Sequence, residues 1–226
     1  MPILANSFFD QDACLLAQQL LGKVIRRKYG KFWLAAQIIE TEAYYLQDKG
    51  SHASLGYTEK RKALFMPAGT IYMYYARGRD SLNVSCMGKG NAVLIKSAFP
   101  YIDPLSPAIT ISTMQQLNPL PSGLLRAKEK LCNGQTLLCT ALDLKVPDWD
   151  QQSFNPNYFY FDDVNYKVNN IVQASRLGIT QGRDENLKYR FIDYDFVTYC
   201  SSNPLTKRNP LSWSIIACEN SHNKEF

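Results

Sequence analysis

The sequence predicts an α+β fold, a single mixed domain in which helices flank a curved, largely antiparallel sheet. Two observations predict it. Short aromatic or β-branched runs fill the first half of the chain, and helical patterns follow them instead of alternating with them, as βαβ units would require. The 226 residues are also 46% hydrophobic and 20% charged, which is ordinary for one globular domain. We therefore expect one domain over residues 1–226, with a frayed tail at 219–226.

The first element is a helix over residues 10–21, because apolar residues recur there at helical spacing and Gly22 supplies a left-handed stop. Strands are then expected at 24–26, 32–44, 70–75, 82–86 and 92–99.

Beyond Pro104 the pattern becomes helical at 123–132 and 135–142, and the pair Asn133-Gly134 forms a turn between the two helices. Residues 147–166, rich in Asn, Asp, Pro and aromatic residues, are typical of a surface loop. Strands around Ile171, at 187–192 and at 196–200 complete the sheet.

Cysteine usage and the N-terminus indicate the compartment. The six cysteines include no Cys-x-x-Cys pair, and only two histidines are available, so we expect reduced thiols and neither a disulfide nor a metal ion. No apolar run reaches about 18 residues, and Asp10 and Asp12 stand where a signal peptide would carry Lys or Arg. The sequence thus predicts a cytoplasmic protein that is neither inserted in a membrane nor secreted.

The charge of the chain is modest, at +5, but its distribution is uneven. Residues 23–31 carry five basic side chains and no acid, and further basic groups follow at 60–62, 77–79 and 126–130. These runs could converge on one face that binds a polyanion, or they could be solvated loop charges. Both interpretations stay open at this point.

Two carboxylates end the apolar run at 37–44. Glu40 and Glu42 are two residues apart, which puts both on one face of a strand. They could be solvated charges, a general base that takes a proton from water, or the acid pair of a glycoside hydrolase acting on a sugar.

Aromatic and basic residues follow in the next part of the chain. His52 precedes the run TIYMYY, in which Tyr72 and Tyr74 share a strand face and could present flat rings to a planar ligand or pack in the core. The turn Arg77-Gly78-Arg79 is suited to entering a DNA groove, although an ordinary exposed turn would explain this sequence equally well.

Taken in order, these segments resemble a known family. IIETEAY, then His52, then LFMPAGTIYMYYARG, LNVSC, AVLIK and NGQTLLCTAL are collinear with the alkyladenine (3-methyladenine) DNA glycosylase family, over about residues 17–200. Several collinear matches, with turns in the corresponding places, are far more specific than any one of them.

The resemblance implies base-excision DNA repair, in which a damaged purine is flipped out of duplex DNA and its N-glycosidic bond is hydrolysed. Glu42 would be the general base that activates the water. Tyr44, His52 and Tyr74 would wall the base pocket. Asn83 would contact the purine edge and reject guanine. Glu40 would support the fold or tune Glu42.

Two positions depart from the family. The family's tyrosine wedge is Arg77 here, in a DNA-inserting β-hairpin that also contains Gly78 and Arg79 and is one residue shorter before Asn83. The family's arginine that helps to hold the catalytic water is Lys96, which keeps the charge but loses the two-pronged geometry.

The resemblance further implies a monofunctional enzyme without cofactor that leaves an abasic site. Its partner would be double-stranded DNA containing damaged purines. It would act as a monomer, in the nucleoid or, in a eukaryote, in the nucleus. The departures at Arg77 and Lys96 also permit a second reading, a catalytically impaired module of the same fold that binds damaged DNA or another nucleic acid.

Overall fold

One nine-stranded sheet organises the chain in the computed structural model, which describes residues 2–206 and 212–218. The strands are β1 (Val24–Tyr29), β2 (Phe32–Tyr44), β3 (Ile71–Ala76), β4 (Arg79–Ser85), β5 (Ala92–Pro100), β6 (Phe159–Asp162), β7 (Asn170–Ala174), β8 (Arg190–Asp193) and β9 (Trp213–Ala217). Their order is β3-β4-β5-β2-β8-β7-β9, and β1 pairs with β2 and β6. Every pairing of these strands is antiparallel, which confirms the predicted α+β fold.

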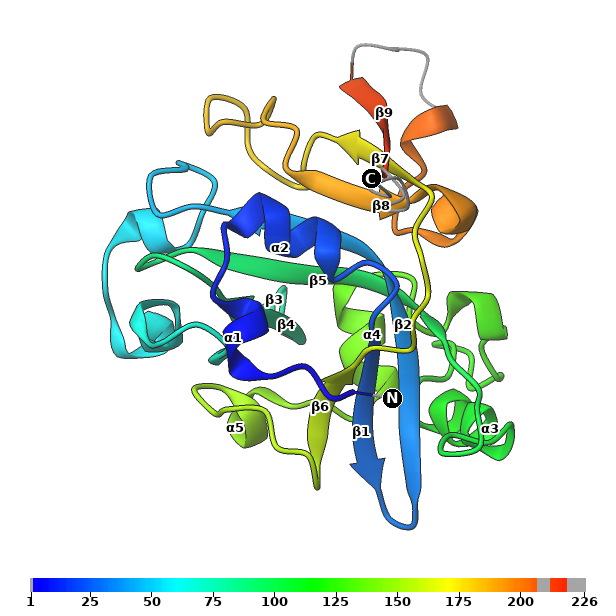
Figure 1. The fold of residues 1–226 in the computed structure, drawn as a ribbon. Helices are drawn as coiled ribbons and strands as arrows, with labels where there is room; N and C mark the ends of the chain where they lie inside the picture. The colour runs from blue at the N-terminus through cyan, green and yellow to red at the C-terminus, as the bar shows by residue number, and fades with distance from the viewer. Residues whose placement is uncertain (1, 207–211, 219–226) are drawn as a thin grey trace, which may run out of the picture.

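The long strand β2 is the axis of the sheet (Figure 1). Its first half pairs with β1, and its second half runs between β5 and β8. The register with β5 shifts on both sides of Glu40. Such an irregularity bends a strand and re-aims its side chains, which is common next to functional sites.

Helices cover the sheet. They are α1 (Asn6–Phe9), α2 (Ala13–Gln19), α3 (Ile109–Leu117), α4 (Gln135–Ala141) and α5 (Val146–Trp149). Helix α2 packs on β2 and β5, and α4 packs on β4 and β5. The predicted first helix starts later than residue 10, because the carboxylate of Asp12 accepts hydrogen bonds from the backbone N–H groups of Cys14 and Leu15 and so caps α2.

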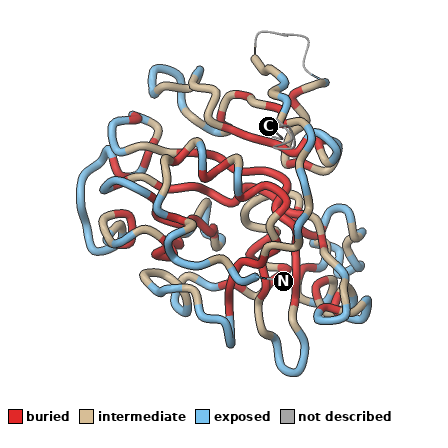
Figure 2. Tube along the Cα trace, in the orientation of Figure 1, coloured by how far each residue is buried: buried red, intermediate tan, exposed pale blue. Residues whose placement is uncertain are grey.

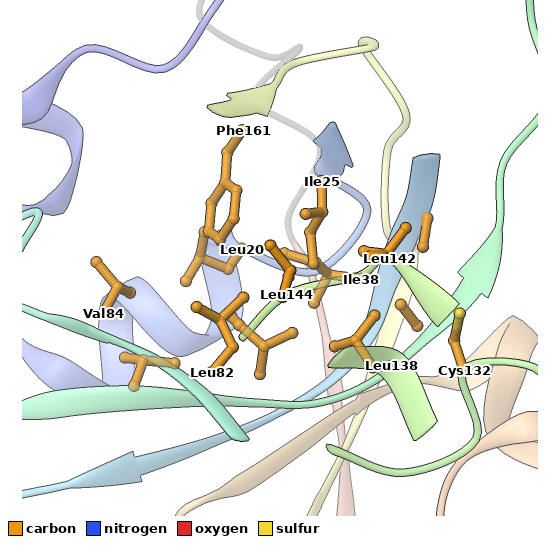
Figure 3. Close-up of a cluster of buried hydrophobic side chains, with 14 of the residues drawn as sticks. Leu20, Ile25, Ile38, Leu82, Val84, Cys132, Leu138, Leu142, Leu144 and Phe161 are labelled. Atoms are coloured by element: carbon orange, nitrogen blue, oxygen red, sulfur yellow. The ribbon is translucent and has the colours of Figure 1, made fainter. Parts of the chain in front are cut away.

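The main core lies where these elements meet. Figure 3 shows Leu20 at the C-cap of α2, Ile38 of β2, Leu82 of β4, Leu138 of α4 and Phe161 of β6 packed together. In Figure 2 the buried segments follow the strands of the sheet, whereas the hairpin tip between β1 and β2 is exposed.

Three predicted elements are wrong. Residues 123–132 form only a 3-10 turn at Lys128–Lys130, since Leu124 and Leu125 stay exposed and only Leu131 and Cys132 at the end of the range are buried. The stretch 147–166 is not simply a surface loop: it contains most of α5 and the strand β6, whose four residues are all buried and which is surrounded by Asn, Asp and Pro residues. Residues 194–199 form a 3-10 helix in place of a strand, because Asp193 caps it through the N–H of Asp195.

Other boundaries also differ. The strand predicted at 187–192 is shorter at its start and forms β8, and the sequence analysis missed α1, α3 and β9. The pair Asn133-Gly134 does precede a helix, with Gly134 at a φ of +123°. The tail at 219–226, predicted to fray, lies outside the described residues.

Candidate active site

The last residues of β2 bring Glu42 to the site. Its side chain is wholly buried and has three hydrogen-bonding or charged neighbours. The phenol of Tyr44 donates to Oε2 at 2.7 Å, the N–H of Leu177 donates to Oε1 at 2.9 Å, and Nζ of Lys96 lies 3.3 Å from Oε1. Burial raises the pKa of the Tyr44 phenol well above its usual range, and the Glu42 carboxylate raises it further, so the phenol remains the donor.

Glu40 belongs to a different network. Nε of Arg190 donates to Oε1 at 2.6 Å and the hydroxyl of Ser201 donates to the same oxygen at 2.8 Å. The hydroxyl of Ser97 and the N–H of Ser201 donate to Oε2 at 2.7 and 2.8 Å. Four donors fill the acceptor capacity of the carboxylate. These are the contacts of a buried structural ion pair, and Glu40 does not line the cavity described next.

A cavity of about 820 Å³ opens in front of Glu42. The predicted site residues that line it are Tyr44, His52, Tyr74, Arg77, Arg79, Asn83 and Lys96. Glu42 lies behind this lining, in contact with Tyr44, Lys96 and Leu177, which all face the cavity. Gly78 lies outside the lining and forms the turn between the two arginines.

Three rings form one wall of the cavity. The rings of His52 and Tyr74 meet at a centroid distance of 4.4 Å and an angle of 68°, and Tyr72 stacks beside Tyr74 at 5.6 Å. Nδ1 of His52 lies 2.9 Å from the Tyr72 hydroxyl. Burial lowers the pKa of His52, and the positive charges of Arg61 and Arg183 lower it further. His52 is therefore neutral near pH 7, and the wall carries no cation.

Asn83 reaches the cavity from β4, where it pairs with Tyr72 of β3. Its Nδ2 donates to the carbonyl of Tyr72 at 3.2 Å. This hydrogen bond fixes the amide plane and directs Oδ1 away from the Tyr72 carbonyl. The Asn83 side chain is thus held in place at the cavity lining.

The hairpin of β3 and β4 carries two arginines to the cavity. Arg77 and Gly78 form a two-residue turn with φ values of +51° and +78°, as in the turns that match the twist of a tight hairpin. Arg77, Arg79 and the nearby Arg183 line the cavity, and within the described ranges none of the three is in an ion pair. The mouth is consequently positively charged.

The other basic runs behave differently. Arg26 in the first run is buried and pairs with Asp162 and Asp103 at 2.8 and 2.6 Å, and Lys23 pairs with Asp163. Of the four runs, only the one at 77–79 lines the cavity.

Sequence analysis missed several residues of the site. Leu177 acts through its backbone N–H, and Arg176 packs against Tyr44. The segment Ser175-Arg176-Leu177-Gly178-Ile179 also resembles the family, but that match assigned no role to either residue. Gln135 lines the cavity and its Nε2 donates to Ser81 at 3.1 Å and to the Tyr74 hydroxyl at 3.4 Å. The turn pair before α4 was the signal that could have indicated Gln135.

All six cysteines have free thiols, and four are buried. Burial raises the pKa of Cys86 to about 12. Residues 2–206 and 212–218 hold no group of three or more His, Cys, Asp or Glu side chains placed to bind a metal ion. No helix in those same ranges has the length and apolarity needed to cross a membrane.

Comparison with known proteins gives a consistent result. A family model described as methylpurine-DNA glycosylase (MPG) matches residues 7–195. A protein of Pseudomonas aeruginosa (strain LESB58), provisionally named 3-methyladenine DNA glycosylase, is 59% identical over 204 residues, which cover 90% of this chain and 85% of the relative. Proteins with the same provisional name from Pseudomonas syringae pv. tomato and Koribacter versatilis are 58% and 29% identical; the alignments cover 90% and 86% of this chain and 92% of each relative. The chain therefore belongs to the methylpurine-DNA glycosylase family and is a DNA repair glycosylase for alkylated bases.

Proposed function

We propose that this glycosylase flips an alkylated or deaminated purine from duplex DNA into the cavity and hydrolyses its N-glycosidic bond with a water activated by Glu42. The observation that supports this role is the incomplete hydrogen bonding of Glu42. Its carboxylate has three polar neighbours, whereas the four acceptor sites of Glu40 are all in use. The acceptor site that remains on Oε2 of Glu42 suits a water molecule.

The cavity walls suit a purine. The rings of Tyr44, His52 and Tyr74 offer flat surfaces for stacking, and the electron-rich tyrosine faces favour an alkylated, positively charged base. A neutral His52 does not repel such a base. Asn83 would contact the purine edge and reject the exocyclic amine of guanine.

Lys96 would hold the water and balance the charge of Glu42. Its Nζ lies 3.3 Å from Oε1 of Glu42 and so serves as the counter-charge of the carboxylate, a role that calls for no lysine Schiff base. We therefore propose a monofunctional enzyme that stops at the abasic site. Borohydride treatment during the reaction should trap no covalent protein–DNA adduct.

Damaged double-stranded DNA is the proposed partner. The hairpin with Arg77, Gly78 and Arg79 would enter the duplex at the flipped nucleotide, and arginine can both stack and bind phosphate. The enzyme would act as a monomer on the DNA of the nucleoid.

Base release tests the proposal. Duplexes carrying hypoxanthine or ethenoadenine, and alkylated DNA containing 3-methyladenine, are incubated with the protein and with Glu42→Gln. We expect release by the unmodified protein and a loss of at least about 100-fold in Glu42→Gln. Glu129→Gln, which changes an exposed acid outside the cavity, is the matched control and should release base normally.

The replacement of the wedge tyrosine by Arg77 and of the arginine by Lys96 favours a second candidate, a binding module with impaired hydrolysis. That candidate predicts tight, lesion-selective binding without base release. Release that depends on Glu42 would eliminate it.

A further inference from the structure

Arg176 connects three segments that build the cavity. It follows β7, is 4% exposed, and extends to the end of β2. Its Nη1 donates to the carbonyl of Ala43 at 3.0 Å and to Oδ2 of Asp48 at 2.9 Å. Asp48 lies in the loop that leads to His52, so one side chain fixes the strand end, this loop and the segment after β7 relative to one another.

The guanidinium of Arg176 also lies against two aromatic rings. Its Cζ is 4.5 Å from the ring centroid of Tyr44 and 5.4 Å from that of Tyr189. Nε and Nη2 are buried and have no hydrogen-bond acceptor among the described residues. A buried donor without an acceptor costs about 1–3 kcal/mol, and the cation–π contact offsets only part of this cost. Because two of its donors are buried without an acceptor, the guanidinium of Arg176 is not explained by its contribution to the stability of the fold alone. Its stacking on the two rings therefore indicates a further role.

That geometry acts on Glu42. Tyr44 is the ring on which the guanidinium lies, and its hydroxyl donates to Oε2 of Glu42. The next residue after Arg176, Leu177, donates its N–H to Oε1. Both oxygens of the carboxylate are thus held by groups that Arg176 restrains, while the arginine is absent from the cavity lining.

We infer that Arg176 is a positioning residue for base excision: it fixes the ring of Tyr44 and, through Tyr44 and Leu177, the carboxylate of Glu42. The inference rests on the proposed function, since it assigns Glu42 and Tyr44 the roles given above. Arg176 itself touches neither the base nor the water.

The test is a double-mutant cycle with Arg176→Lys and Tyr44→Leu. Lysine keeps the charge beside Asp48 but cannot stack as a plane, and leucine removes the ring. Single-turnover release of hypoxanthine should slow about tenfold in Arg176→Lys, because a small misplacement of catalytic groups is costly. In the Tyr44→Leu background the same change should slow release by clearly less than tenfold, because only the contact through the N–H of Leu177 remains. If Arg176→Lys slows release by the same factor in both backgrounds, or slows it in neither, the inference is overturned.

A second measurement does not depend on cleavage. In a Glu42→Gln background, which leaves the lesion intact, the affinity for an ethenoadenine duplex is compared with that for an undamaged one. Arg176→Lys should reduce this discrimination about tenfold while leaving the affinity for undamaged duplex unchanged. If the unmodified protein discriminates but releases no base, the proposed function fails and this readout decides the role of Arg176. A protein that neither releases nor discriminates overturns both.

The matched control is Arg26→Lys. Arg26 is equally buried and ion-paired, with Asp162 and Asp103, and does not line the cavity. This variant should unfold at a lower temperature yet release base at the unmodified rate. If Arg26→Lys slows release as much as Arg176→Lys, the effect is a general loss of structure and the inference is overturned.

Discussion

Glu40 and Glu42 stand two residues apart on β2, and both are wholly buried, yet their surroundings differ. Glu40 accepts four hydrogen bonds, one of them from an arginine at 2.6 Å. Glu42 has a phenol, a backbone N–H and a lysine at 3.3 Å, and the groups around it line a cavity. A saturated carboxylate can only stabilise the fold, whereas an unsaturated one beside a cavity can also bind water.

The largest predicted effect concerns stability. Glu40→Gln should lower the free energy of unfolding by about 3 kcal/mol, because it leaves Arg190 buried without its counter-charge. Glu42→Gln should lower it less, since Lys96 lines the cavity and can turn to water. Denaturant unfolding of both variants measures the difference.

The same pair of variants can also refute the division of roles. Folded Glu40→Gln should still release base. Loss of all release in Glu40→Gln at unchanged stability would move Glu40 into the catalytic machinery.

The two networks also show what the sequence could predict. The strand, the two-residue spacing of the acids and the hairpin at 77–78 follow from local patterns, and the structure contains all three. The difference between Glu40 and Glu42 does not, because it depends on Arg190, Ser201 and Leu177, more than 130 residues later.

The errors in the fold have the same origin. Strand β6 is surrounded by Asn, Asp and Pro residues that indicate a loop, and only its pairing with β1 makes it a strand. The role of Arg176 likewise does not follow from its own segment, since its partners Ala43, Asp48 and Tyr44 are distant in sequence. The family resemblance named residues that line the cavity, but assigned no role to the residues that support them.

The next effect is catalytic and concerns the weakest contact of Glu42. Lys96→Met removes the positive charge 3.3 Å from the carboxylate and should slow single-turnover release about tenfold. Lys96→Arg restores a planar donor and should release base at least as fast as the unmodified protein. A rate for Lys96→Met equal to that of the unmodified protein would show that Glu42 needs no cation beside it.

A smaller effect is expected at the cavity mouth. Arg77 is in no ion pair within the described part of the chain and should contact phosphate. Arg77→Ala should reduce the slope of log affinity against log salt concentration by about one, and by the same amount for duplexes of different DNA sequence. Binding titrations at several salt concentrations check this. An unchanged slope combined with lost lesion selectivity would indicate that Arg77 stacks in the duplex and makes no phosphate contact.

The smallest predicted effect tests whether the cavity wall stays neutral beside Glu42. Burial, Arg61 and Arg183 hold the pKa of His52 below its ordinary 6.5 in the folded protein. As the pH falls below 6.5 the unfolded chain therefore takes up the proton first, and His52 contributes stability above this pH that is lost on acidification towards its folded pKa. His52→Gln should remove this pH-dependent contribution to stability. The unfolding temperatures of the two proteins, measured from pH 7.5 to pH 5, should therefore approach each other as the pH falls. If acidification instead stabilises the unmodified protein relative to the variant, His52 is charged in the folded state. A cation would then face the bound base, and it would repel an alkylated, positively charged purine.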